Sequence, residues 1–372
     1  RERGVGTTKG ERKNYIDNYF PVSVPATKSA PKEDVIYAVN FTDGGYALLA
    51  ADSRIPEDIL AVTDDGRITE SDFEEPVFEK VVTDNDDLSE SEYDAMVESG
   101  VLATIDIENQ INRECLQYAV NSIDEDPTSG DRGGSATGSS AEPETYSWEI
   151  IEKVPRMLST AWTQDTREHD VFNKYCPVVG LLIKRKAPAG CVCIALSQII
   201  AYHEYPDNLT CNGIQIDYTA IKKIYYYFDG YGVYGLGTDA SIDMLARFCI
   251  EVGACCNTRY HSIFGNSFGF AWPTDAKSCL ETFGYKNVSL DWKYDEARVL
   301  ECLDNGCPVF MSDVSGLCAG HAWVIDGYVN RDYVSNKGRV KKSQTLVHCN
   351  WGWAGNCNGY FNSGVFKTKY AE

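Results

Sequence analysis

The chain of 372 residues contains no apolar run near the roughly 20 residues that a membrane-spanning helix requires, so we expect no membrane span. No internal repeat is visible, and nothing at the start resembles a secretory signal peptide. We therefore expect residues 1–4 to be the start of a trimmed chain from which an export signal is absent.

Basic residues are scarce in the first part of the chain. Residues 1–150 hold 33 acidic and 12 basic side chains, a net charge of −21, whereas residues 151–372 hold 22 of each. An acidic part joined to a neutral part indicates two units with different roles, although the acidic excess would also keep the first unit soluble. The excess argues against a nucleic-acid partner, which requires a basic surface.

Cysteine is also scarce before residue 176, where Cys115 stands alone among the 14. The close pairs Cys191/Cys193 and Cys255/Cys256 lack the spacing of a zinc knuckle, so we expect no metal and no other cofactor. If one cysteine from residue 176 onward is a reactive thiol, the other twelve could form disulfides in an oxidising compartment. Free cysteine is also an ordinary small core residue, and the spacing leaves both possibilities open.

The first half has the pattern of a mixed α+β unit. Residues 35–41 and 46–51 are rich in β-forming side chains around Asp43-Gly44-Gly45, which predicts a hairpin, and residues 59–62 predict a further strand. Residues 89–121 have helical spacing of apolar residues over most of their length. We therefore expect an α+β first domain with an antiparallel sheet and at least one long helix.

The composition changes abruptly between Asp124 and Thr145, where Asp, Glu, Pro, Ser, Thr and Gly dominate. Such a segment cannot bury enough apolar surface to offset its ordering entropy, and flexible joints are preferred sites of proteolysis. This predicts three parts: a first domain over residues 1–125, a cleavable linker over 126–147 and a second domain over 148–372.

The second domain begins with helices and ends with strands. Residues 190–203 and 240–252 have the apolar spacing of helices, and residues 309–311, 322–325 and 345–349 have the pattern of strands. This order favours an α+β arrangement of two packed lobes over a parallel sheet.

Cys191 begins the stronger of these helices, directly after Gly190. A helix N-terminus and a nearby imidazolium both lower the pKa of a thiol, which a cysteine nucleophile requires at neutral pH. Cys193 is the alternative nucleophile. Two residues along a helix rotate the side chain by about 200°, so only one of the two can face a cleft. Because Cys193 shares a flank with apolar residues, we assign Cys191 as the nucleophile.

Only five histidines are available as the general base. His321 opens an apolar strand about 130 residues after Cys191. Alone, it would be interpreted as a core histidine, but with the cysteine segment it completes the two halves of a cysteine-protease site. His203 ends the helix of the nucleophile and is too far along it, His169 and His261 are expected in polar loops, and His348 is expected in a strand.

Two further polar residues complete the predicted site. Asn350 could accept the imidazole N–H through its amide oxygen, with Trp351 and Trp353 shielding that bond from water. The alternative is an aromatic-rich turn that fills space between lobes. Gln164 could donate its side-chain NH₂ to an oxyanion, beside the backbone N–H of Cys191.

These segments together resemble the streptopain family of bacterial cysteine peptidases, within the papain-like clan. The order Gln, Cys, His, Asn is the same, and the resemblance extends over about residues 150–366. Residues 39–56 also resemble the propeptide of that family. The resemblance rests on Gln164, the Gly190-Cys191-Val192 helix with Tyr202-His203-Glu204-Tyr205-Pro206 at its end, Gly320-His321-Ala322, and Asn350-Trp351-Gly352-Trp353.

The resemblance implies a papain-like two-lobe catalytic domain in a zymogen, with the prodomain as intramolecular inhibitor and autoprocessing in the linker. Protein or peptide substrates are implied, as is a secreted, periplasmic or cell-surface location. The site residues carried over are Cys191 as nucleophile, His321 as general base and acid, Gln164 as oxyanion donor, and Asn350 and Trp351 around the imidazole. The substrate-binding residues would be Gly320 and, in the loop 264–269, Ser267.

Two other classes of function remain possible on sequence grounds. A papain-like binding protein without activity is one, although the complete set of four catalytic residue types argues against it. A papain-clan acyltransferase is the other, although that class usually has Asp where this chain has Asn350. The high cysteine content departs from streptopain-like enzymes and leaves open whether the extra thiols pair or respond to oxidation.

Overall fold

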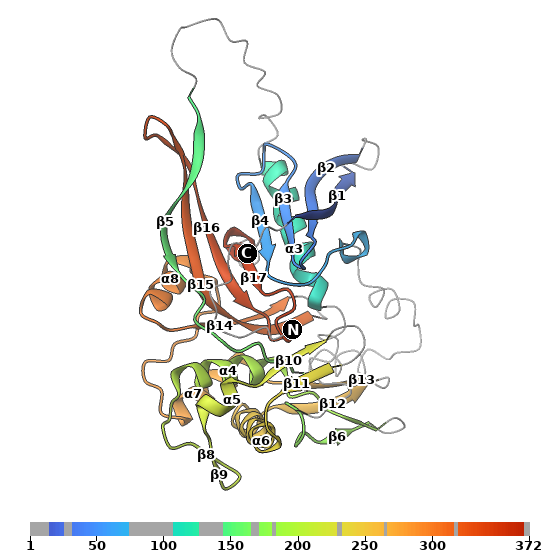
Figure 1. Ribbon diagram of the computed structural model, residues 1–372, viewed down its shortest axis with the longest axis vertical. Coiled ribbons are helices and arrows are strands. Elements are labelled where there is room, and N and C mark those ends of the chain that lie inside the picture. The colour runs from blue at the N-terminus through green and yellow to red at the C-terminus, as the bar shows by residue number, and fades with distance from the viewer. Residues whose placement is uncertain are drawn as a thin grey trace, which may run out of the picture.

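The computed structural model describes residues 15–25, 32–73, 107–125, 144–164, 171–180, 184–228, 233–263, 266–315 and 319–367. Figure 1 shows a long twisted sheet in the upper part of the view, with the helices α4, α5, α6 and α7 gathered below it. We call these two parts the sheet lobe and the helical lobe. The mixed architecture with antiparallel sheets confirms the predicted α+β class.

The sheet lobe combines strands from both ends of the chain. Its elements are β1 (Ile16–Pro25), β2 (Lys32–Phe41), β3 (Tyr46–Ala50), β4 (Ile59–Thr63), a 3₁₀ turn (Glu70–Phe73), α3 (Ile107–Glu125), β5 (Tyr146–Val154), α8 (Glu296–Asp304), β14 (Val309–Ser315), β15 (Ala319–Ser335), β16 (Val340–Asn350), β17 (Gly359–Asn362) and α9 (Gly364–Lys367). The predicted hairpin is present as β2 and β3, and the predicted third strand is β4. The helix pattern over 89–121 is met by α3 from Ile107 onward, and residues 89–106 lie outside the described residues.

The helical lobe lies between these segments in the sequence. Its longer elements are α4 (Cys191–His203), α5 (Tyr218–Lys222), α6 (Asp239–Cys255), β12 (Arg259–Ile263), β13 (Asn266–Phe270) and α7 (Pro273–Thr282). Short strand pairs complete it: β6 (Val178–Val179) with β7 (Arg185–Lys186), β8 (Thr210–Cys211) with β9 (Ile214–Gln215), and β10 (Tyr225–Phe228) with β11 (Val233–Leu236). His261, which we expected in a loop, lies in β12, and His169 is outside the described residues.

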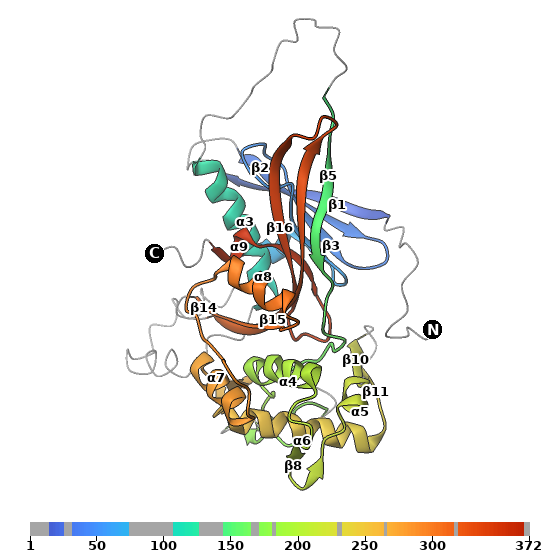
Figure 2. The same cartoon turned by 90° about the vertical axis from the view of Figure 1, so that its left-hand side faces the viewer.

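Nine strands form one sheet in the order β1-β2-β3-β4-β17-β16-β15-β14, with β5 also paired to β15. The junction between the first domain and the second is the antiparallel pairing of β4 with β17, where Thr63 is opposite Gly359 and Ala61 is opposite Phe361. In Figure 2, α3, α8 and α9 lie on the same side of this sheet. Residues of β2, β3 and α3 share one hydrophobic core with residues of β15, β16 and β17. The two predicted domains are thus joined by both backbone pairing and a common core.

The predicted linker and the structure differ at one end. Tyr146 and Ser147, the last two residues of the predicted linker, already belong to β5, where Tyr146 is opposite Ser335 and Ser147 is opposite Val334. Just before them, the guanidinium of Arg339 donates to the Glu144 carboxylate. The described part of this segment begins at Glu144, and residues 126–143 lie outside the described residues.

Helix α4 forms the centre of the helical lobe. Ten consecutive residues from Val192 to Ala201 are buried, so the helix is enclosed on all its faces by the rest of the lobe. The helix ends at His203, and the next residue, Glu204, caps it with a φ of 50°, the left-handed conformation common at a helix C-terminus. An enclosed, well-terminated helix is a rigid base for whatever its first residue carries.

Candidate active site

Cys191 is the first residue of α4. Gly190 precedes it with a φ of 94°, in the left-handed region that favours glycine. A Cβ at Gly190 would lie 2.8 Å from the carbonyl oxygen of Gly269 in β13, so no side chain fits there. The glycine therefore allows the chain to turn tightly against β13 and to begin the helix at the thiol.

Cys193 lies on a different side of α4, in the core of the helical lobe. Its side chain is 1% exposed, whereas Cys191 retains some exposed surface. The Cys193 thiol donates a hydrogen bond to the carbonyl oxygen of Cys249 in α6 at 3.0 Å. This placement agrees with the rotation argument made from the sequence. All thirteen cysteines within the described residues are free thiols.

The surroundings of the Cys191 thiol affect its pKa in opposite directions. Burial of the thiol group raises its pKa above the ordinary value, and backbone N–H groups that hydrogen-bond to the sulfur partly offset the increase. These N–H groups belong to Ala322, Val192 and Cys191 itself. The contact with Ala322 brings the start of α4 to β15, next to the histidine that the sequence predicts as its partner.

His321 lies in β15 and is 5% exposed. Its Nε2 is 2.8 Å from the carbonyl oxygen of Trp351, which as an acceptor requires the ring N–H on that nitrogen. The neutral ring then carries its lone pair on Nδ1, which is buried and has no hydrogen-bond partner among the described residues. Burial lowers the pKa of His321 to about 4, against a smaller opposing effect of the Trp351 carbonyl.

Three tryptophan rings are stacked with this imidazole, one of them Trp323 in the same strand, with its centroid 6.3 Å away. The His321 ring is stacked against Trp353 with centroids 4.9 Å apart, and Trp351 lies at 6.4 Å with an interplanar angle of 25°. Trp351 is 3% and Trp353 is 8% exposed, so the rings exclude water from one side of the histidine. The shielding role predicted for these residues is compatible with this arrangement.

The side chain of Asn350 forms its hydrogen bonds with groups other than the His321 imidazole. Its Oδ1 accepts from the Gly352 N–H at 3.2 Å, and its Nδ2 donates to the carbonyl oxygen of Thr160 at 2.8 Å. The imidazole N–H that we expected to donate to the Asn350 amide oxygen donates instead to the backbone carbonyl oxygen of the next residue, Trp351. The predicted segment therefore holds the histidine, but through its backbone.

Gln164 is placed close to the start of α4 by its backbone. Its carbonyl oxygen accepts from the Ala189 N–H at 2.8 Å, two residues before the predicted nucleophile. The preceding residue, Thr163, forms a β-bridge with Trp353, one of the rings beside the histidine. These contacts bring the segments of Gln164, Cys191 and His321 to one place.

The two predicted substrate-binding residues lie close to the segments that carry His321 and Cys191. Gly320 directly precedes His321 in β15. Ser267 lies in β13, two residues from the Gly269 that packs on Gly190, and its hydroxyl donates to the carbonyl oxygen of Lys186 at 3.1 Å. Residues 264 and 265 of the predicted loop lie outside the described residues.

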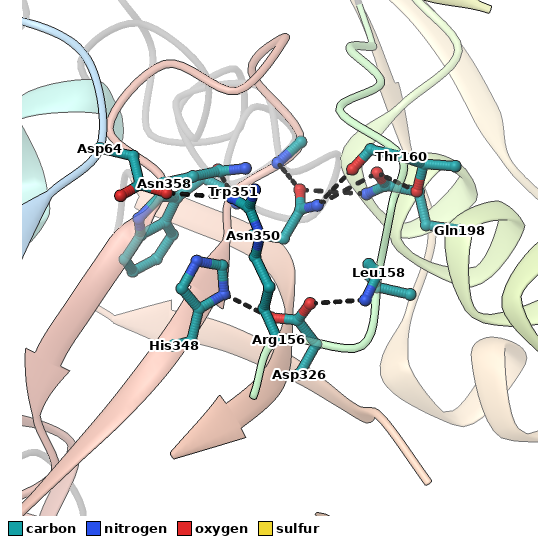
Figure 3. Close-up of polar contacts among 11 residues, drawn as sticks. Asp64, Arg156, Leu158, Thr160, Gln198, Asp326, His348, Asn350, Trp351 and Asn358 are labelled. Atoms are coloured by element: carbon teal, nitrogen blue, oxygen red, sulfur yellow. Dashed lines mark hydrogen bonds and ion pairs between the residues drawn. The ribbon is translucent and has the colours of Figure 1, made fainter. Parts of the chain in front are cut away.

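Buried polar contacts around the site include some that the sequence did not indicate (Figure 3). Asp326 Oδ1 is 2.5 Å from His348 Nδ1, and its other oxygen accepts from the Leu158 N–H at 2.8 Å, which fixes the segment that leads to Gln164. Asn358 Oδ1 accepts from the Trp351 N–H at 3.0 Å. No spacing motif connects these residues, so only their positions in the folded chain reveal them.

Two absences apply to the described part of the chain. It contains no group of three or more His, Cys, Asp or Glu side chains arranged to hold a metal ion. None of its helices is both long and apolar enough to cross a lipid bilayer.

Comparisons with known proteins support a single family. Residues 162–361 match the family model described as Peptidase C10 family. Streptopain of Streptococcus pyogenes is 28% identical over 218 residues, which is 51% of this chain and 49% of streptopain. Streptopain of the serotype M28 strain MGAS6180 is 27% identical over the same shares. The chain therefore spans about half the length of the curated relatives it matches.

A solved structure extends the fold similarity to almost the whole chain. The prointerpain A fragment 39–359 of Prevotella intermedia covers 94% of this chain, and 93% of the fragment is covered in return. The TM-score is 0.54 at 20% sequence identity. At this identity the likeness concerns the fold, and it includes the first domain as well as the second.

Proposed function

The chain belongs to the Peptidase C10 family, and on that premise we propose that it is the zymogen of a cysteine endopeptidase with Cys191 as nucleophile and His321 as general base. The observation that carries the proposal is the meeting of three distant segments at the start of α4. The Ala322 N–H reaches the Cys191 sulfur, and Trp351 holds Nε2 of His321, which leaves Nδ1 available to take a proton.

The proposed reaction has two stages. Nδ1 of His321 takes the proton of the Cys191 thiol, and the sulfur forms a bond to the carbonyl carbon of the scissile peptide. The developing oxyanion is stabilised by the backbone N–H of Cys191 and the side-chain NH₂ of Gln164. The imidazolium then protonates the leaving amine, so the C–N bond breaks and an acyl-enzyme remains. Water activated by His321 releases the acid product and restores the thiol.

The protonation states favour a latent form of the uncut chain. Burial raises the pKa of the Cys191 thiol and lowers that of His321 to about 4, so both groups are uncharged at neutral pH. A reactive thiolate–imidazolium pair requires the opposite directions. We propose that removal of residues 1–125 changes the surroundings of the pair and permits its ionisation.

The contacts of the first domain support its role as an inhibitor. Strand β4 extends the sheet at β17, and the Asp64 N–H donates to the carbonyl oxygen of Asn358 at 2.7 Å. Asn358 in turn accepts from the Trp351 N–H, and Trp351 holds His321. The Asp64 side chain also forms an ion pair with Arg156 at 3.0 Å. The first domain is thus connected to the residues around the histidine by short chains of hydrogen bonds.

We propose protein or peptide substrates, bound in part by the backbone at Gly320 and by the region of Ser267. We also propose that the protein acts after export, in the periplasm, at the cell surface or in the medium. A peptidase that is made with an inhibitory domain can be exported without cleaving the cytoplasmic proteins of the cell that makes it. Proteolytic processing would remove the acidic first domain and thereby relieve the inhibition.

The experiment is N-terminal sequencing of the purified chain after incubation under reducing conditions. We expect cleavage within residues 126–147, before Glu144, because Glu144 is bonded to Arg339 and Tyr146 and Ser147 are paired in β5. The product should retain the activity and be close to neutral, because residues 151–372 hold equal numbers of acidic and basic side chains. The Cys191→Ala chain should stay uncut until a trace of active enzyme is added.

Each part of the proposal has its own contradicting result. Full peptidase activity of the uncut chain would refute the assignment as a zymogen but not the assignment as a peptidase. If Cys191 reacts with an electrophile but no processed form of the chain cleaves peptides, the assignment as a peptidase is refuted. Incorporation of amines into peptides without hydrolysis would indicate an acyltransferase instead.

A further inference from the structure

Gln198 is a fully buried polar residue in the middle of the helix that begins with Cys191. It lies seven positions after the cysteine, about two helical turns or roughly 10 Å along α4, and its exposed fraction is 0%. All other residues from Val192 to Ala201 except Ser197 are apolar. A buried primary amide is costly unless its donors and acceptor are satisfied, so its partners are informative.

The first partner is Asn350, at the end of β16 in the sheet lobe. Gln198 Nε2 donates to Asn350 Oδ1 at 3.3 Å, and Asn350 Nδ2 is 3.3 Å from Gln198 Oε1. The two amides therefore face each other as a reciprocal pair, which joins the helical lobe to the sheet lobe. Asn350 directly precedes Trp351, whose carbonyl oxygen holds the His321 ring.

The second partner is the segment that leads to Gln164. The Thr160 hydroxyl donates to Gln198 Oε1 at 2.9 Å, and the Trp162 N–H is 3.3 Å from the same oxygen. Asn350 Nδ2 also donates to the carbonyl oxygen of Thr160 at 2.8 Å, so the three residues close a ring of hydrogen bonds (Figure 3). We call Gln198, Asn350 and Thr160 the amide clamp.

We propose that Gln198 is a positioning residue that sets the separation of Cys191, His321 and Gln164. The inference deepens the proposed function and rests on it. One side chain is hydrogen-bonded to the two segments that carry His321 and Gln164, and it stands on the helix that carries Cys191. Because α4 is enclosed and rigid, a shift of the clamp moves the thiol relative to the imidazole.

A glutamine that only fills the core would give a different result on substitution. It would lower stability and leave the chemistry of the folded fraction unchanged. A positioning residue changes the geometry of the reacting groups, and a misplacement of about 1 Å can cost roughly a hundredfold in rate. The distinction therefore requires a readout of the thiol and imidazole in the folded protein.

The test compares Gln198→Met with Ser197→Ala, both processed to the mature form with a trace of active enzyme. Ser197 is the adjacent residue on α4, also 0% exposed, with its hydroxyl near the Cys193 thiol at 3.9 Å and outside the clamp. We measure kcat and KM with a peptide substrate, the pH dependence of Cys191 alkylation by iodoacetamide, and the melting temperature.

We expect Gln198→Met to lower kcat by about tenfold to a hundredfold with KM within about twofold, and to shift the pH profile of alkylation. Ser197→Ala should lower only the melting temperature. The double variant Thr160→Val/Gln198→Met should have a kcat only slightly below that of Gln198→Met alone, because both substitutions open the same clamp. Gln198→Glu, which keeps the accepting oxygen and loses the donated bond, should be intermediate in kcat.

Unchanged kcat and an unchanged alkylation profile in folded Gln198→Met would overturn the inference, as would full additivity with Thr160→Val. If Gln198→Met does not fold, Gln198→Glu takes its place with the same criteria. The alkylation profile does not need peptide cleavage. A wild-type protein without peptidase activity would therefore refute the proposed function, while the alkylation profile recorded on the uncut chains, which needs no processing, would still decide the role of Gln198.

Discussion

The buried imidazole of His321 should make the stability of the uncut chain depend on pH. Its pKa is lowered to about 4 by burial, from an ordinary value near 6.5. The unfolded chain therefore takes up a proton at this residue in a pH range where the folded chain does not. Stability from this group is fully present above about pH 6.5 and is lost as the pH falls toward 4.

The magnitude follows from the size of the shift. A difference of about 2.5 pKa units, at about 1.36 kcal/mol for each unit, corresponds to roughly 3 kcal/mol between pH 7.5 and pH 4. Other groups also titrate in this range, so the contribution of His321 must be separated from theirs. A variant without the imidazole provides that separation.

The assay is urea unfolding of Cys191→Ala and of Cys191→Ala with His321→Gln, both of which remain uncut. The free energy of unfolding of each chain is measured from pH 7.5 to pH 4. We expect the chain with His321 to lose about 3 kcal/mol more than the His321→Gln chain over this range. Parallel pH curves for the two chains would refute the burial argument, and with it the account of latency.

Two further predictions concern the start of α4 and the oxyanion. Gln164→Ala should lower kcat of the processed enzyme by about 10²–10³, with little change in melting temperature, because one preorganised donor is lost; full activity would remove Gln164 from the mechanism. Gly190→Ala should destabilise the protein by about 1–3 kcal/mol in urea unfolding, because its φ is 94° and its Cβ would lie 2.8 Å from the Gly269 carbonyl oxygen. Gly253→Ala is its control within the same lobe, since Gly253 has no positive φ and the nearest atom to its Cβ is the Tyr260 hydroxyl at the end of a side chain.

The sequence was sufficient for the elements that have strong local patterns. Helix α4 was predicted within one residue, because its apolar residues, the glycine before it and the polar residues after it all mark its bounds. The hairpin of β2 and β3 was predicted from its Asp-Gly-Gly turn. The same kind of local pattern predicted that Cys191 begins a helix and that His321 lies in a strand.

Contacts between distant segments were beyond a single sequence. The pairing of β4 with β17 joins residues about 300 positions apart. No local sequence pattern shows which strand β4 will pair with. Asn350 was expected on the imidazole because its side chain is the more obvious acceptor. The backbone carbonyl of Trp351 takes that place, because the amide is already engaged by Thr160 and Gln198. Gln198 was not predicted, because it lies within an apolar helix and its partners, Thr160 and Asn350, are distant in the sequence.

The most direct test of the account is the site at which a thiol-directed epoxide labels the processed enzyme, determined by mass spectrometry of its peptides. We predict one adduct, on Cys191, with loss of peptidase activity in proportion to labelling, and no adduct on the buried Cys193. Labelling of Cys193 in place of Cys191, or continued peptide hydrolysis after Cys191 is fully labelled, would contradict the central claim.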